Sequence, residues 1–81
     1  MADKTESSLH VSRNEAADLL QGIARELRGE GTANITVGNK TVQLTPASMI
    51  DYEIATDERS PMLRKSEETV TIQLRWSVDD E

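Results

Sequence analysis

The sequence predicts an α+β fold of two layers, in which one N-terminal amphipathic helix packs on a four-stranded antiparallel sheet in the order α-β-β-β-β. One early stretch repeats apolar residues at helical spacing, and four later stretches alternate apolar with polar residues. Strands with one apolar and one polar face are typical of an antiparallel sheet that is wet on one side. Because 81 residues build only one core, we expect a disordered tail at 1–10, a single domain at 11–78 and an acidic tail at 79–81.

The helix is expected at about 13–28. Ser12 and Glu15 have the spacing of a capping box, in which the serine hydroxyl accepts a hydrogen bond from the backbone N–H of the glutamate. Gly29 is expected to end the helix in the left-handed conformation. The apolar stripe that would face the sheet is formed by Ala16, Leu19, Leu20, Ile23, Ala24 and Leu27.

A β-hairpin is predicted after the helix. Residues 33–37 and 41–44 alternate apolar and polar side chains on either side of Gly38-Asn39, which is a two-residue hairpin signal. A loop of this length gives the cross-strand pairs Val37 with Lys40, Ile35 with Val42, and Ala33 with Leu44. Since directly opposed residues share a face, the apolar residues of both strands are expected on one side of the sheet.

Two more strands are predicted at about 50–55 and 69–78, joined by a polar loop at 57–67. The inward-facing residues of the last strand are expected to be Val70, Ile72, Leu74, Trp76 and Val78. Tyr52 shares the apolar parity of its own strand. We therefore predict that Trp76 and Tyr52 lie in the core, where aromatic rings contribute most by burial, and that Trp76 is not a stacking platform for a base or a sugar.

Composition excludes several function classes. The formal net charge is -6 and the longest basic cluster is Arg64-Lys65, so phosphates would be repelled and we expect no nucleic-acid partner. The absence of cysteine excludes disulfides, thiolate metal sites and cysteine nucleophiles, and it fits a reducing cytoplasm. The sequence contains no apolar run of membrane-spanning length and no secretory signal pattern, so we expect a cytoplasmic protein without a membrane partner.

Three segments together carry a resemblance to a known family. They are the amphipathic segment 15–27, the strand and proline step Val42-Gln43-Leu44-Thr45-Pro46, and Trp76 late in an alternating strand. In their order and spacing they make the chain similar to the small amphi-Trp domain proteins over roughly residues 9–78. Proteins of this family are frequent in salt-loving archaea and also occur in bacteria. The resemblance implies a stand-alone cytoplasmic domain and supplies no catalytic residue that could be transferred to this chain. It also favours salt adaptation as the reason for 15 acidic against 9 basic side chains, although an ordinary soluble acidic protein fits the same composition.

Few residues have the pattern of a catalytic or metal site. His10 is the only histidine, and it lies in the tail or at the helix entry without a second histidine or a cysteine nearby in sequence. Asp51 and Glu53 alternate onto one strand face, where an open sheet would solvate them instead of holding them in a cleft. We therefore expect a non-enzymatic protein without catalytic residues, metal site or cofactor.

The polar face of the sheet is the candidate functional surface. Its short, uncharged or mixed side chains can meet a protein partner or a second copy, and an exposed strand can pair edge to edge, although solvation alone is the plainer interpretation. The candidate residues are Thr36, Thr41, Gln43, Glu53, Thr71, Gln73 and Arg75. The favoured hypothesis is a non-enzymatic protein-interaction domain. The alternative is a small-ligand or metal-binding module that uses loop 57–67 and the acidic tail.

Overall fold

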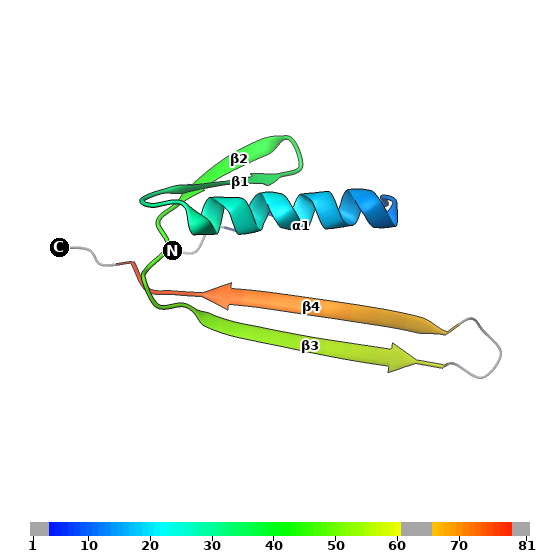
Figure 1. The fold of residues 1–81 in the computed structure, drawn as a ribbon. Coiled ribbons are helices and arrows are strands. Elements are labelled where there is room, and N and C mark those ends of the chain that lie inside the picture. The colour runs from blue at the N-terminus through cyan, green and yellow to red at the C-terminus, as the bar shows by residue number, and fades with distance from the viewer. Residues whose placement is uncertain (1–3, 61–65, 79–81) are drawn as a thin grey trace. The chain divides into compact units, whose positions relative to one another are not determined.

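The computed structural model of the chain describes residues 4–60 and 66–78. Within them one helix is followed by four strands, as Figure 1 shows. The elements are α1 (Arg13–Arg28), β1 (Ala33–Val37), β2 (Lys40–Leu44), β3 (Asp51–Arg59) and β4 (Glu67–Arg75). The predicted α+β class and the predicted order of elements are confirmed. The chain divides into two compact units, Met1–Pro46 and Ala47–Glu81.

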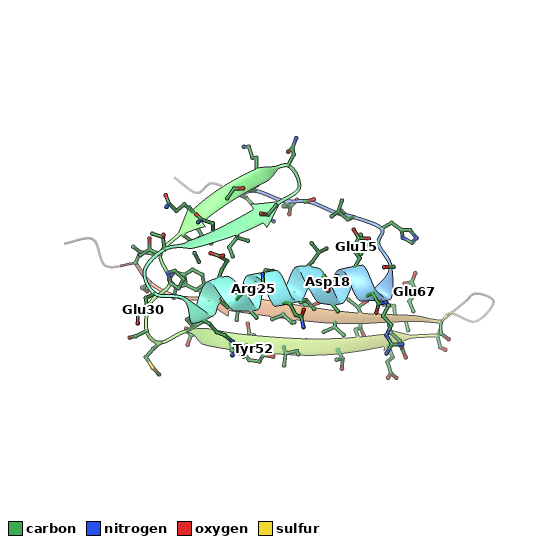
Figure 2. The ribbon with its side chains drawn as sticks, turned by 45° about the horizontal axis from the view of Figure 1, so that its top comes forward. Glu15, Asp18, Arg25, Glu30, Tyr52 and Glu67 are labelled. Atoms are coloured by element: carbon green, nitrogen blue, oxygen red, sulfur yellow. The ribbon has the colours of Figure 1, made fainter. Side chains whose placement is uncertain are left out.

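The first unit begins with α1, whose start is capped as predicted. The Ser12 hydroxyl accepts a hydrogen bond from the Glu15 N–H at 3.1 Å, which satisfies one of the unpaired donors of the first turn. Glu15 lies in the first turn and Arg25 in the last, so each charge is attracted to the opposite partial charge at its end of the helix dipole. Figure 2 shows both residues along α1. The predicted left-handed conformation of Gly29 is wrong, because its φ is −70°. Gly31, with a φ of 85°, supplies the turn into β1 instead.

The strands β1 and β2 pair antiparallel in the predicted register. Ala33 lies opposite Leu44, Ile35 opposite Val42 and Val37 opposite Lys40. Gly38 has a φ of 65°, whereas Asn39 keeps a negative φ, which is the pattern of a type II′ turn with glycine at its first central position. The glycine is needed here because this backbone conformation strains residues that carry a Cβ.

The core of the first unit lies between α1 and the apolar face of its hairpin. Ala33 is 1% exposed, and α1 contacts β1. The other apolar residues of the hairpin are half-buried, namely Ile35, Val37, Val42 and Leu44. The polar residues that alternate with them are exposed, so the predicted division into an apolar and a polar face is confirmed in this unit. Leu20 on α1 is nevertheless 54% exposed, so one flank of the apolar stripe is not covered by the hairpin.

The second unit is a longer hairpin of β3 and β4. The two strands pair antiparallel along nine residues each, with Tyr52 opposite Leu74 and Ile54 opposite Ile72. The apolar residues of both strands therefore share one face, as their parity predicts. Regular pairing continues to Arg59 and begins again at Glu67, so the ends of the predicted loop 57–67 belong to strands.

The expected single four-stranded sheet is not among the observed pairings. The strands form two separate two-stranded sheets, β1 with β2 and β3 with β4. Pro46 lies in the link between them and has no backbone N–H to donate to a sheet ladder. Alternation assigns side chains to faces and leaves open which strand edges pair.

Two expectations about the core of the second unit change. The last strand ends at Arg75, so Trp76 follows it as a half-buried residue and Val78 is exposed, whereas the sequence placed both inside a strand that ran to 78. Tyr52 is 62% exposed, so its predicted core position is wrong. Its parity with Ile54 is correct, and what is missing is a second layer over that face of the hairpin within its own unit.

Candidate functional site

The seven candidate residues fall on two surfaces, one in each unit. Thr36, Thr41 and Gln43 lie on the first sheet, and the second sheet carries Glu53, Thr71, Gln73 and Arg75. All seven are exposed.

On the first sheet, Thr36 lies directly opposite Thr41, and Gln43 lies opposite Asn34. The paired side chains are short or uncharged, and hydroxyl and amide groups both donate and accept hydrogen bonds. They alternate with the apolar residues that face the core of this unit. This surface is therefore a small, neutral hydrogen-bonding area held in place by a packed layer behind it.

On the second sheet, polar side chains from β3 and β4 meet near the open end of the hairpin. Glu53 lies opposite Gln73, and Asp51 lies opposite Arg75. The Arg75 Nη2 atom is 3.8 Å from the Glu53 Oε1 atom across the diagonal, and both side chains are exposed. Such exposed pairs contribute little to stability. These residues and Tyr52 line a shallow hollow of about 330 Å³, so their donors and acceptors are accessible to a ligand or a partner.

The strand edges differ in how well they are covered. The Asn34 N–H on the outer edge of β1 donates a hydrogen bond to the Glu26 Oε1 atom at 2.9 Å, so a side chain of α1 occupies this edge. The edge role of Glu26 was missed in the sequence, where its residue type favours a solvated position on the helix. A carboxylate in the last turns of a helix, a few residues before a strand, is the signal that could have suggested it.

An apolar hollow of about 640 Å³ lies in the first unit between α1, β1 and the preceding segment. Leu19 and Ile23 line it from the helix, and Val37 lines it from β1. Ser7 lies beside the hairpin turn, because a Cβ placed on Gly38 would come within 3.2 Å of the Ser7 hydroxyl oxygen. Residues 4–10 of the predicted tail contain no helix or strand, yet they contribute to the wall of this hollow.

The residues that could support the alternative function are only partly described. Residues 61–65 of the predicted loop and the acidic tail at 79–81 lie outside the described residues. At the end of the hairpin, the Ser60 and Ser66 hydroxyl oxygens are 2.8 Å apart, and Arg59 Nε is 3.7 Å from Asp57 Oδ2. Over residues 4–60 and 66–78, no three histidine, cysteine or acidic side chains are grouped as metal ligands.

His10 and the carboxylates of β3 also lie apart from any enclosed site. His10 is exposed, and Asp51 and Glu53 stand exposed at the open end of the β3–β4 sheet. Both carboxylates line the shallow hollow described above, where solvent reaches them. In the part of the chain that the structure describes, no helix has the length and apolarity needed to cross a membrane.

Comparisons with known proteins identify the family and nothing narrower. A search of curated proteins and a search of solved structures each returned no match. The model of the Amphi-Trp domain matches residues 1–81, which is the whole chain. This match agrees with the resemblance carried by the amphipathic helix, the strand and proline step and the late tryptophan. The chain belongs to the Amphi-Trp domain family.

Proposed function

We propose that this chain is a non-enzymatic protein-interaction domain, which binds a partner protein through the polar face of a sheet or through a strand edge. The observation that carries the proposal is the exposure of the β3–β4 hairpin, in which every residue of β3 and all but Leu74 of β4 are exposed. An isolated two-stranded hairpin is marginally stable in water. A long hairpin with this exposure is therefore a surface that gains stability when a partner covers it.

Exposed apolar side chains on the same hairpin support the proposal. Tyr52, Ile54, Val70 and Ile72 all lie on one face, and even Ile72, the least exposed of them, is 43% exposed. Contiguous apolar patches on a small protein mark interaction surfaces. The polar residues on the opposite face, with Glu53 and Arg75 at its open end, provide the hydrogen-bonding groups through which a partner would bind that face.

We also propose that in solution the two hairpins join in a single four-stranded antiparallel sheet, with α1 as the helical layer over its β1–β2 strands, where α1 contacts β1. Both observed sheets are antiparallel, and each has one apolar face. Backbone NOEs between a strand of the first sheet and a strand of the second would support this arrangement. If amide NOEs were confined to the β1–β2 and β3–β4 pairs, the proposal would be rejected.

We also propose a cytoplasmic location and a surface adapted to salt. The absence of cysteine supports the cytoplasmic location, and the net charge of -6 supports the salt adaptation. The salt adaptation is tested by thermal unfolding in increasing KCl, where we expect the melting temperature to rise up to molar salt as repulsion among the acidic side chains is screened. A melting temperature that falls with salt would contradict it.

The interaction function is tested by affinity capture from the host organism with matched charge variants. Gln73→Arg and Gln43→Arg each place a charge on one candidate surface, whereas Gln21→Arg makes the same change on the exposed side of α1. We expect the Q73R or Q43R variant to lose a captured partner at least tenfold, while Q21R retains it. Equal capture by all three variants, with circular dichroism unchanged, would reject these surfaces as the binding site.

A further inference from the structure

The outer edge of β4 is the least protected strand edge in the described chain. Each described strand pairs with one neighbour, so each leaves one edge without a strand partner among the described residues. Natural proteins protect such edges with charged side chains, prolines, short strands or a covering group. β1 and β2 have five residues each, and Glu26 occupies the edge of β1. β3 carries five charged residues out of nine.

β4 has none of these protections in its centre. It is nine residues long, and its charges are confined to Glu67 and Glu68 at one end and Arg75 at the other. The six residues between them, 69–74, include no charge, proline or glycine. They alternate threonine or glutamine with valine, isoleucine or leucine, which is the composition that favours strand pairing.

We propose that a second copy of this chain pairs with this edge, β4 against β4, antiparallel and centred on Thr71. The proposal rests on the proposed interaction function and names its partner. A two-fold axis through Thr71 brings the same strand of both copies together, as in an isologous dimer interface. Because Thr71 is the middle residue of Glu67–Arg75, all nine residues of each strand take part in this register.

The charges at the strand ends select this register. When Thr71 lies opposite Thr71 of the second copy, Glu67 of one chain lies opposite Arg75 of the other. This pair occurs twice by symmetry. Opposite charges in directly opposed positions stabilise a sheet, and like charges destabilise it. Val70 then lies opposite Ile72 of the second copy, so the apolar residues of both hairpins stay on one face. The two β3–β4 hairpins then form one continuous sheet with their apolar residues on the same side.

Two other self-pairings oppose like charges. A parallel, in-register β4 pair would set Glu67 against Glu67 and Arg75 against Arg75. An antiparallel β3 pair centred on Ala55 would set Asp51 against Arg59 twice, but it would also set Glu53 against Asp57 twice, so attraction and repulsion offset each other. The antiparallel β4 pair has the two attractive pairs without a repulsive one, so charge complementarity favours it over both alternatives.

The first test adds one lysine to either strand of the same hairpin. Thr71 and Ala55 lie directly opposite each other in the β3–β4 ladder, and both are exposed. Thr71→Lys would set two lysines against each other on the two-fold axis, whereas Ala55→Lys adds the same charge one strand away from the edge. Sedimentation equilibrium should give twice the 9.0 kDa chain mass for wild type and A55K. T71K should have a dimer dissociation constant at least tenfold larger.

The second test exchanges the charges at the strand ends. The Glu67→Arg and Arg75→Glu variants should each be monomeric alone, because each would oppose like charges at both ends of the pair. Mixed in equal amounts they should form a heterodimer, since both ends then oppose unlike charges. A change that only damaged the hairpin through its own neighbours, such as Glu53 beside Arg75, would not be rescued by mixing, and that result would overturn the proposal.

The third test uses the absence of native cysteine. A Thr71→Cys chain should form disulfide-linked dimers under mild oxidation, because the two cysteines meet at the axis. A Thr69→Cys chain should not, because its cysteine faces Gln73 of the second copy and lies about four residues along the strand from its own counterpart. Equal cross-linking of both variants would overturn the register.

Failure of this proposal is distinguishable from failure of the interaction function. A wild-type chain that stays monomeric at native salt and millimolar concentration, or a dimer that T71K leaves intact, would overturn the β4 pair alone. Loss of a captured partner in Q73R or Q43R would still support the interaction function in that case. Dimerisation that is lost in T71K and kept in A55K supports the β4 pair directly.

Discussion

The two hairpins of this protein are built from the same alternating pattern and differ in what covers them. In the β1–β2 hairpin the apolar face lies against α1, and Ala33 is almost fully buried. In the β3–β4 hairpin the equivalent face is largely exposed although its register is equally regular. Alternation therefore specifies which residues share a face. Whether that face contributes to stability depends on a second layer.

The difference also separates the two polar surfaces. Thr36 and Thr41 are held by a hairpin whose other face is packed, so that surface is rigid and neutral. Glu53 and Arg75 lie on a hairpin that is exposed on both faces and has an unprotected edge along β4. A partner that covers the second hairpin would bury more new surface than one that covers the first.

The largest expected effect is the loss of stability when a charge enters the core of the first unit. Ala33→Asp should lower the free energy of unfolding by about 3–5 kcal/mol, because the carboxylate would be buried without a partner. Gln43→Asp, at an exposed position of the same hairpin, should cost about 0.5 kcal/mol or less. Urea denaturation followed by circular dichroism measures both. Similar midpoints for the two variants would show that this core is not closed.

A smaller effect is expected from removal of the only tryptophan. Trp76 is half-buried, so Trp76→Ala should cost about 2 kcal/mol, or roughly half of what a fully buried tryptophan loses. Thermal unfolding measures the change. A variant as stable as the wild type would place the indole ring in water, and a loss as large as that of A33D would place it in a closed core.

A matched pair of isoleucines compares the hairpins directly. Ile35→Thr in the packed hairpin should cost about 1–2 kcal/mol, since it removes buried apolar surface and buries a hydroxyl. Ile54 is 54% exposed, and Ile54→Thr should cost about 0.5 kcal/mol or less. Equal losses in urea denaturation would mean that the β3–β4 face is covered in solution, and the contrast between the hairpins would disappear.

The helix cap offers a test of a single hydrogen bond in the first unit. Ser12→Ala removes the acceptor of the Glu15 N–H and should cost about 1 kcal/mol. Ser48→Ala makes the same change at an exposed position outside the helices and strands, so thermal unfolding should detect no loss there. If S48A were destabilised as much as S12A, the loss in S12A could not be assigned to the hydrogen bond of the helix cap.

The smallest expected effect concerns the edge of β1. Glu26→Ala removes the acceptor of the Asn34 N–H and should cost about 0.5–1 kcal/mol, as for a hydrogen bond near the surface. Hydrogen exchange of the Asn34 amide should become faster in this variant. Glu26→Gln keeps an oxygen acceptor, so its exchange rate should stay near that of the wild type. Unchanged exchange in E26A would show that the carboxylate does not protect this edge.

The sequence was sufficient for several local features that depend on near neighbours. The cap at Ser12 follows from the position of Glu15, and the turn at Gly38 follows from the φ that only glycine adopts without strain. The register of β1 with β2 follows from the loop length and the pairing of apolar positions. The outward direction of the seven candidate residues follows from parity alone, because successive side chains of a strand point to opposite faces.

Interactions between distant segments decided the rest. The sequence placed Tyr52 in a core, but a core needs a covering layer, and parity cannot show whether one is present. The helix ends at Arg28 before Gly29 as predicted, but the positive φ lies at Gly31, where the chain turns into β1. The edge role of Glu26 depends on α1 lying beside β1. Local periodicity fixes the faces of strands and helices, and only tertiary packing decides which of those faces and edges meet.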